Sequence, residues 1–239
     1  MAPKKSIETL NALPLPDYRA KLWRHASTLV HTHKDTSTSY DISLESPSTL
    51  SSSAFRACFD LIASTSSADY EASSKGWSPA KKRREMRLPD LRYLLLQQRV
   101  EDGDANGGCI RDQPQVVQGF VSFMLTCEDG YEVIYLYEIH LSSYLQGQGL
   151  GKKLMDMMEE IGRKAGVEKS MLTVFTRNEG ARGFYEGLGY GIDEFSPRAR
   201  KLRSGVVREV DYLILSKSLK NCDGGREGKE RSFKRRKAV

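Results

Sequence analysis

The sequence predicts a mixed α/β fold built around one sheet. Two observations support this prediction. Strand patterns at 116–125 and 131–141 follow one another across a short turn, and from residue 149 onward helix patterns alternate with strand patterns. Strands that first come in a block and then alternate with helices are typical of a sheet with helices packed against it.

The composition is that of a soluble globular protein. Of 239 residues, 39% are hydrophobic and 28% are charged, which is enough for one sizeable domain with extensions. No apolar run approaches the ~18 residues of a membrane span, and the first ten residues lack the apolar core of a secretory signal. The four cysteines show neither CxxC pairs nor metal-site spacing, so we expect reduced thiols. The lack of a long apolar run predicts that the protein has no membrane partner.

The net charge is concentrated at the carboxyl end. Residues 216–239 hold nine Lys or Arg against three Asp or Glu, which equals the +6 of the whole chain. We expect residues 218–239 to be a disordered basic tail, because Gly, Lys, Arg and Glu cannot bury a core. The run FKRRK at 233–237 fits a nuclear import signal or a transient contact with chromatin or the ribosome. It fits equally a tail that only keeps the protein in solution.

Helices are predicted where apolar residues recur every three or four positions. Ser51 to Ser53 offer a capping hydroxyl for the second of them, and Pro79 suits the first turn of the third. The predicted helices are 17–30, 53–66, a short one from residue 79, 149–164 and 178–188.

Strands are predicted from runs of apolar and β-branched residues between polar segments. Asp129-Gly130 closes a hairpin between the two long ones, and residues 101–114 are predicted to be a polar hairpin loop. The sequence before residue 53 that is not otherwise assigned is expected to be loop. The predicted strands are 40–44, 91–98, 116–125, 131–141, 170–176, 189–193 and 208–216.

The stretch QGQGLGKKL at 146–154 links the strand at 131–141 to a helix. The first amides of a helix have no acceptor within it and carry partial positive charge. Gly147, Gly149 and Gly151 let an anion approach them, because glycine has no side chain in the way. The spacing matches neither GxxxxGK[ST] nor GxGxxG. We therefore predict a phosphate-binding turn of another kind, with an ordinary tight turn as the alternative.

Two motifs resemble the GNAT superfamily of N-acetyltransferases. QGQGLG at 146–151 is similar to its acetyl-CoA loop [QR]-x-x-G-x-[GA], and NEGARGFYEGLGY at 178–190 is similar to its N-x-x-A-x-x-F-Y segment. Within the superfamily the chain resembles NatD-type N-alpha-acetyltransferases of histones over residues 53 to 217. The segments that carry this closer resemblance are YEIHL (137–141), GLGKKLM (149–155), MLTVFTRNEGARGFY (171–185) and parts of 59–86.

The resemblance implies a GNAT fold, with a central, mixed, mostly antiparallel sheet flanked by helices, over residues 51–217. Residues 1–50 would be an extension of helix and loop. It implies acetyl-CoA as co-substrate, no metal ion, and direct transfer in a ternary complex. The acceptor would be the amino-terminal serine of histones of types 4 and 2A. The partners would thus be CoA and histone tails, for a monomer in the nucleus and cytoplasm.

Glu138 is the general base that the resemblance implies. From the pattern alone it is equally a surface carboxylate on an alternating strand. An α-amine has a pKa of ~8, so the free-energy cost of removing its proton with a general base is modest. Strict alternation places Tyr135 and Tyr137 on the opposite face. Tyr137 therefore shares the site with Glu138 only if the strand carries a bulge, as sheets often do beside active sites.

The resemblance also assigns the other site residues. Tyr137 and Tyr185 are catalytic candidates for protonating the thiolate, although the NatD pattern has Phe at 185 and packing is the alternative there. Asn178 is a cofactor contact or only a helix cap, and the backbone of 140–142 is expected to pair with the pantetheine arm. The cofactor contacts are His140, Leu141, Ser142, Gln146, Gln148, Gly149, Leu150, Gly151, Lys152, Lys153, Thr173 and Asn178. The substrate contacts are Tyr70, Trp77, Thr126, Tyr135, Tyr137 and Tyr212, with core packing as the alternative for the aromatic ones.

Two positions depart from the NatD pattern. Thr126 stands where the pattern has an aspartate, and Lys75 where it has a tryptophan. Between Phe120 and Glu138 there are still four acids and no Lys or Arg, which favours a cationic peptide. Two other functions fit the same residues: a GNAT enzyme acting on lysine side chains or a small amine, and a weakly catalytic adaptor that binds histone tails.

Overall fold

The computed structural model describes residues 7–23, 28–33, 36–98, 116–201 and 207–220. The predicted loop at 101–114 and the basic tail beyond residue 220 lie outside these ranges. The helices are α1 (Ile7–Asn11), α2 (Leu15–Leu22), α3 (Ser52–Glu71), α4 (Pro79–Glu85), α5 (Leu150–Ala165) and α6 (Glu179–Gly187), with a 3-10 turn η1 (Ser143–Leu145). The strands are β1 (Thr28–His33), β2 (Thr36–Glu45), β3 (Arg92–Gln98), β4 (Val117–Glu128), β5 (Tyr131–Leu141), β6 (Lys169–Phe175), β7 (Gly191–Ile192), β8 (Arg200–Lys201), β9 (Val207–Arg208) and β10 (Tyr212–Ser218).

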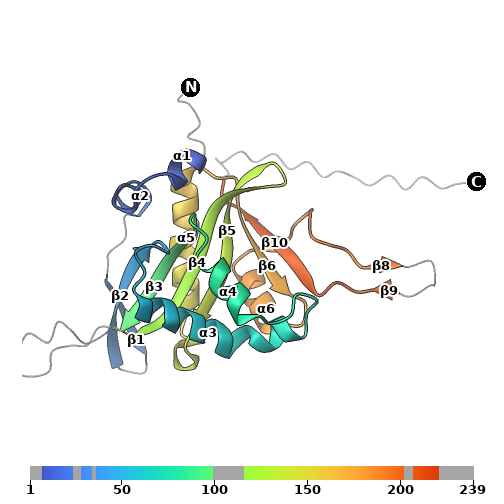
Figure 1. Ribbon diagram of the computed structural model, residues 1–239, viewed down its shortest axis with the longest axis horizontal. Coiled ribbons are helices and arrows are strands. Elements are labelled where there is room, and N and C mark those ends of the chain that lie inside the picture. The colour runs from blue at the N-terminus through green and yellow to red at the C-terminus, as the bar shows by residue number, and fades with distance from the viewer. Residues whose placement is uncertain (1–6, 24–27, 34–35, 99–115, 202–206, 221–239) are drawn as a thin grey trace, which may run out of the picture.

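Eight strands form one twisted sheet in the order β1-β2-β3-β4-β5-β6-β10-β7 (Figure 1). Every neighbouring pair is antiparallel except β5 and β6, which run parallel. The other two strands, β8 and β9, form a small ribbon that projects from the body. The sheet is therefore mixed and mostly antiparallel, as predicted.

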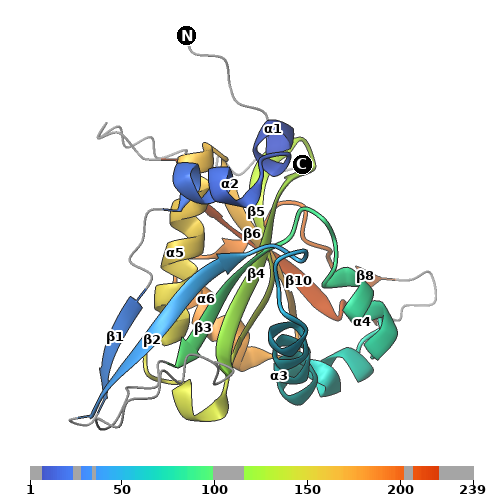
Figure 2. The same ribbon diagram turned by 60° about the vertical axis from the view of Figure 1, so that its left-hand side comes forward.

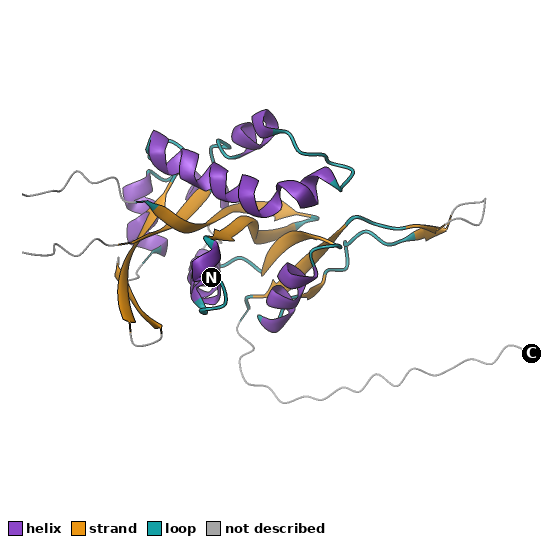
Figure 3. Cartoon of the chain, turned by 90° about the horizontal axis from the view of Figure 1, so that it is seen from below, coloured by secondary structure: helices purple, strands orange, loops and turns teal. Residues whose placement is uncertain are grey.

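Helices cover both faces of the sheet (Figure 3). Apolar residues of α1, α2, α5 and α6 pack with one face in a single buried cluster, and those of α3, together with Met86 just after α4, pack with the other face in a second cluster. Figure 2 shows α2 and α5 on one side of the sheet and α3 and α4 on the other. None of the helices in the described ranges is long and apolar enough to cross a membrane.

Local signals explain the ends of several elements. The Ser51 hydroxyl accepts from the Ala54 N–H at 3.1 Å and caps α3, and α4 begins at Pro79 behind the cap Ser78. Asp129 and Gly130 have φ of 49° and 87°, the left-handed pair that a two-residue hairpin requires. The predicted caps and the predicted hairpin turn are confirmed.

The predicted helix at 17–30 is wrong in its second half. The helix α2 ends at Leu22, Trp23 is extended, and Thr28–His33 is the edge strand β1. Threonine and valine recur in this strand, and β-branched residues favour a pleated conformation. Pairing with β2 thus prevails over the helical spacing of the apolar residues.

The segment before residue 50 is more than the expected extension of helix and loop. The strand predicted at 40–44 is the ten-residue β2, which pairs with β3 from Tyr40–Gln98 to Glu45–Tyr93. Leu10, Tyr18 and Leu22 are buried in the same cluster as the interior of α5. The described residues of this segment therefore belong to the same packed body as the rest of the chain.

Candidate active site

A cavity opens where β5 and β6 separate. The two strands pair from Val133–Lys169 to Leu136–Leu172, whereas β5 continues to Leu141. The space beside the unpaired end of β5 has a volume of about 850 Å³ and is lined by β5, β6, α3, α6 and the start of α5. Its size is in the range of sites that bind small molecules and cofactors.

The glycine turn lies along this cavity. Gly147 and Gly149 have φ of 73° and 79°, a region that glycine adopts without strain. Gly149 is the N-cap of α5 and no side chain caps the helix. A Cβ at Gly147 or Gly149 would meet nothing within 4 Å, whereas one at Gly151 would lie 3.4 Å from the Phe184 ring. The first amides of α5 are therefore open to an anion, the arrangement that binds phosphate at helix starts.

Most of the predicted cofactor contacts line this cavity. They are His140, Leu141, Gln146, Gly149, Gly151, Lys152, Thr173 and Asn178. Ser142, Gln148, Leu150 and Lys153 are not among the lining residues. The Leu150 side chain is fully buried in the core, and the Gln148 amide donates to the Tyr144 carbonyl. These two side chains serve packing and the turn, and their predicted contact with the cofactor, which the backbone can also make, stays a prediction.

The backbone groups that face the cavity are those of Ile139 and Leu141, whereas the predicted stretch was 140–142. The Ser142 N–H donates to the Gln118 carbonyl of β4 at 2.8 Å. Because backbone groups alternate along an antiparallel pair, His140 also directs its backbone toward β4. Ile139 and Leu141 direct theirs toward the gap, and the Leu141 carbonyl accepts from Gln146 Nε2 at 3.0 Å.

A bulge in β5 brings the two central residues to one face. The register with β4 passes from Ser122–Glu138 directly to Phe123–Leu136, so Tyr137 has no partner. Tyr137 packs with the cluster beneath α3 and α4, and Glu138 bonds to side chains of the same two helices. The condition for Tyr137 and Glu138 to share one site is thus met.

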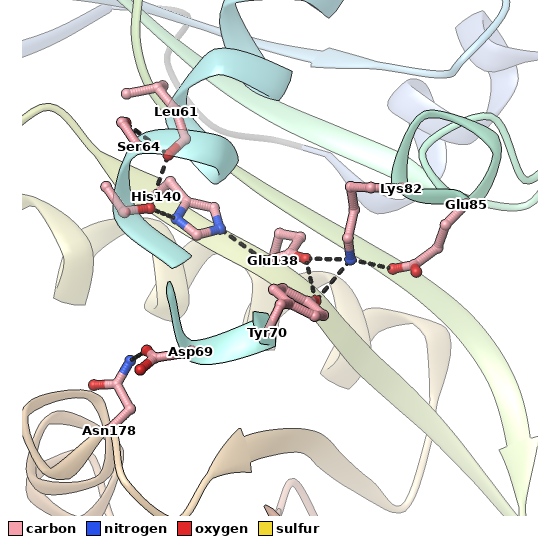
Figure 4. A network of polar contacts seen from close by, with 10 residues as sticks. Leu61, Ser64, Asp69, Tyr70, Lys82, Glu85, Glu138, His140 and Asn178 are labelled. Carbon is pink, nitrogen blue, oxygen red and sulfur yellow. Dashed lines mark hydrogen bonds and ion pairs between the residues drawn. The ribbon is translucent and has the colours of Figure 1, made fainter. Parts of the chain in front are cut away.

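Three side chains hold the carboxylate of Glu138, which is only 9% exposed (Figure 4). Lys82 Nζ of α4 lies 2.7 Å from Oε1, and the Tyr70 hydroxyl of α3 donates to the same oxygen at 3.0 Å. His140 Nε2 lies 2.7 Å from Oε2, and His140 Nδ1 lies 2.6 Å from Thr65 Oγ1. Glu138 is therefore a buried, fixed carboxylate and not a surface residue.

This arrangement fixes the charges of the cluster. Burial would raise the pKa of Glu138, but the hydrogen bond from His140 and the charge of Lys82 outweigh it and lower the pKa to about 2. Burial would likewise lower the pKa of Lys82, but Glu138, Tyr70 and Glu85 raise it well above its usual value. Glu138 and Lys82 are thus an ionised pair at neutral pH. Burial and then Glu138 raise the pKa of Tyr70, whose phenol stays protonated.

Two predicted residues of the segment 178–185 lie at the wall of the cavity. Tyr185 is buried there, and burial followed by the charge of Glu138 raises the pKa of its phenol, which stays a proton donor. Asn178 Oδ1 accepts from the Ala181 N–H at 3.0 Å and caps α6. Its Nδ2 donates to Asp69 at 2.9 Å (Figure 4). Asn178 therefore caps α6 and also lines the cavity, and its role as a cofactor contact stays a prediction.

Aromatic rings surround Glu138 on the side of α3 and α4. The Tyr70 ring centre lies 5.6 Å from that of Trp77 and 5.0 Å from that of Phe175. Tyr137 and Tyr135 are 5.8 Å apart. Of the predicted substrate contacts, Tyr70 and Tyr137 line the cavity.

The other predicted substrate contacts lie outside the lining of the cavity. The Trp77 ring stacks on Phe59 in the cluster under α3, which is the packing alternative. Tyr135 bonds to Thr173 Oγ1 at 2.6 Å. Tyr212 lies under the ammonium group of Lys75, 5.2 Å from its ring centre. Thr126, in β4 opposite Val133, is partly buried.

Sequence reasoning missed Lys82 and Thr65. Lys82 lies within the basic run KKRREM and looks like its exposed neighbours, yet only 4% of it is exposed. One signal was present: Lys82 is four residues before the buried Met86, so both lie on the same face of α4. A lysine on a buried face needs a partner of opposite charge.

Among the described residues, no group of three or more His, Cys, Asp or Glu side chains could hold a metal ion. Cys58 is buried and Cys127 exposed, and neither forms a disulfide.

Comparison with known proteins gives a family and several curated relatives. The model of the acetyltransferase (GNAT) family matches residues 68–190. N-alpha-acetyltransferase 40 of Saccharomyces cerevisiae is 35% identical over 40% of this chain and 41% of its own length. An uncharacterised protein of Bacillus subtilis, YxbD, is 26% identical over 46% of this chain and 65% of its own length. The chain thus spans less than two thirds of either relative.

Solved structures share the fold. An acetyltransferase from Streptococcus agalactiae superimposes with a TM-score of 0.51 at 13% identity, covering 74% of this chain and 98% of its own. An acetyltransferase of the GNAT family from Staphylococcus aureus Mu50 gives 0.50 at 13% identity, covering 75% and 99%. At this identity the likeness concerns the fold alone.

Proposed function

The chain belongs to the acetyltransferase (GNAT) family, whose members use acetyl-CoA, and on that premise we propose that it acetylates the α-amine of protein substrates. The observation that carries the proposal is the placement of Glu138. A buried, ionised carboxylate stands at the bulge of β5, and the glycine turn follows the end of the same strand. An acceptor for a proton and a site for an anion therefore border one cavity.

The residues present fit acetyl-CoA. The open amides at the start of α5, beside Gly147 and Gly149, would hold the pyrophosphate. The backbone of Ile139 and Leu141 would pair with the amides of the pantetheine arm as an added strand does. Bound there, acetyl-CoA supplies an acetyl group as a reactive thioester.

Glu138 takes the proton that the attacking nitrogen loses. With a pKa of about 2, its carboxylate removes a proton poorly from an ammonium group, whose pKa is near ~8 for an α-amine. The nitrogen becomes far more acidic once its lone pair bonds to the acetyl carbon, and the carboxylate then accepts its proton. Tyr185, held protonated at the cavity wall, is proposed to donate a proton to the leaving thiolate, with Tyr137 as the other phenol in reach of the cavity.

The proposed acceptor is the amino terminus of a cationic tail, namely the serine of histones of types 4 and 2A. Two observations support it. The yeast protein that is 35% identical over part of the chain is an N-alpha-acetyltransferase. Burial and the negative charges of Glu85 and Glu128 raise the pKa of Tyr137, so two acids lie near this side of the site. We also propose that the protein is a monomer of the nucleus and cytoplasm, with the basic tail beyond residue 220 in contact with chromatin or ribosome.

The test is acetyl-CoA turnover on a Ser-Gly-Arg-Gly-Lys peptide in three forms: unmodified, with its α-amine blocked, and with its lysine blocked. We expect the unmodified and lysine-blocked peptides to react alike and the α-blocked peptide to be inert, with the product located by mass spectrometry. Reaction of the α-blocked peptide would indicate a lysine acetyltransferase. Tight binding of peptide without turnover would indicate an adaptor.

A further inference from the structure

We propose that Lys82 determines specificity: by neutralising Glu138 it makes the site accept an amine that is already uncharged and exclude the ammonium group of a lysine side chain. The proposal rests on the proposed function and deepens it. It names the substrate class, unprotonated α-amines, and the residue that selects it.

The position of Lys82 shows that its charge is committed to the site. Its Nζ lies 2.7 Å from Glu138 Oε1, 2.7 Å from the Tyr70 hydroxyl and 2.9 Å from Glu85 Oε1. These contacts use all three donors of the ammonium group. Glu85 is 40% exposed and screened by water, so the buried partner of Lys82 is Glu138.

The carboxylate of Glu138 is correspondingly occupied. A carboxylate offers about four lone-pair positions. Lys82 and Tyr70 take two at Oε1, and His140 takes one at Oε2. One position remains for the nitrogen of a substrate. The negative charge is already compensated, so a second ammonium group would be buried without a partner, which is strongly unfavourable.

The other titratable groups around the pair do not change this balance. Tyr70 and Tyr93 are protonated, because burial and then nearby groups raise the pKa of each. His140 lies on the opposite carboxylate oxygen and occupies it by a hydrogen bond. The groups that face Lys82 and Glu138 are Tyr70, Glu85, Tyr93, Tyr137, His140 and Tyr185.

A site that accepts only uncharged amines separates the two substrate types by their basicity. At pH 7 roughly a tenth of an α-amine with a pKa near 8 is uncharged, against about one part in 2,500 of a lysine with a pKa near 10.4. The ratio is about 200-fold. This preference arises before any contact with the rest of the peptide.

The experiment compares two peptides of one sequence, one with a free α-amine and acetylated lysine, the other with an acetylated α-amine and free lysine. kcat/KM is measured at pH 7 for the wild type, Lys82→Met, Lys82→Gln and Lys82→Arg, with Lys81→Met as a control at an exposed position of the same helix. Circular dichroism and the Kd for acetyl-CoA establish that each variant is folded.

We expect the wild type and Lys82→Arg to prefer the α-amine by about 200-fold or more, and Lys81→Met to match the wild type. In Lys82→Met and Lys82→Gln the preference should fall at least tenfold, because an uncompensated Glu138 can bind the ammonium group of a lysine side chain and accept its proton within the site. An unchanged preference in these two variants overturns the proposal while leaving the α-amine function intact. A wild type that prefers the lysine peptide overturns the function itself.

A measurement on the wild type alone covers the case in which the Lys82 variants fail to fold. A peptide that begins with β-alanine presents an amine about as basic as that of lysine, at nearly the same place. Its reaction should be more than tenfold slower than that of the serine peptide at pH 7, and the gap should shrink at least tenfold by pH 9.5. A gap of equal size at both pH values overturns the proposal, since it would arise from shape and not from charge.

Discussion

The ion pair of Glu138 and Lys82 predicts how the stability of the protein changes with pH. The pKa of Glu138 is about 2 in the folded protein, against 4.5 as its ordinary value. Because folding lowers this pKa, the stabilisation is fully present above pH 4.5 and is lost as the pH falls toward 2. The difference corresponds to about 3 kcal/mol at neutral pH, of which about 2 kcal/mol is lost at pH 3.

The measurement is the free energy of unfolding from denaturant titrations at pH 7 and pH 3, for the wild type and for Glu138→Gln, which cannot titrate. We expect the loss on acidification to be about 2 kcal/mol smaller in the variant. Glu138→Gln removes the buried partner of Lys82 and is less stable at pH 7, so each protein is compared with itself. Glu186→Gln, which replaces a half-exposed carboxylate paired with Arg182, should behave as the wild type. An equal loss in Glu138→Gln and the wild type would refute the ionised pair.

Four changes test the cavity and its substrate. Gly149→Val should raise the Kd for acetyl-CoA tenfold or more in calorimetry, because a β-branched residue resists a φ of 79°. An unchanged Kd in a folded variant would mean that the glycine turn does not bind the phosphates of acetyl-CoA. Glu138→Gln should lower turnover by about 10²–10⁴-fold at an unchanged Kd, and near-normal turnover would mean that Glu138 is not the base. Asn178→Ala should lower stability by about 1 kcal/mol through loss of the α6 cap, with little change in Kd; a tenfold weaker Kd would instead make it a cofactor contact. A substrate with Ala for Arg at its third position should react more slowly at low salt and less so at high salt, because exposed charges are screened over about 10 Å at 0.1 M; equal rates for both peptides at both salts would mean that the acids near Tyr137 do not read the tail.

The fold was predictable where each element carries its own signal. The pair β4 and β5 combines alternating residues with a two-residue turn, and α5 lies between a glycine turn and a glycine C-cap at Gly166. The amino-terminal part offered a misleading signal, because Leu22 and Leu29 have the spacing of a helix although Leu29 lies in the edge strand β1. Pairing of β1 with β2 favours the strand over the helix. Such pairing depends on two segments of the chain, so the pattern within one segment does not predict it.

The same distinction holds for the site. The glycine turn was predictable because its shape depends on the positive φ of Gly147 and Gly149, a conformation that glycine adopts without strain. The partner of Glu138 was not, because Lys82 is 56 residues away in the sequence and lies among lysines and arginines that are exposed. A pattern of charges along one helix does not say which of them faces a carboxylate on another element.

The bulge in β5 accounts for the composition of the site. Before it, Tyr135 and Tyr137 face α3 and α4, and after it Glu138 and His140 face the same way, as their contacts with each other and with those helices show. A regular strand of six residues would present three side chains to one face, whereas this one presents four. Without the extra residue Glu138 and His140 would point into the apolar core on the side of α5. The bulge is thus what allows one strand to supply both the aromatic side chains and the proton acceptor to one cavity.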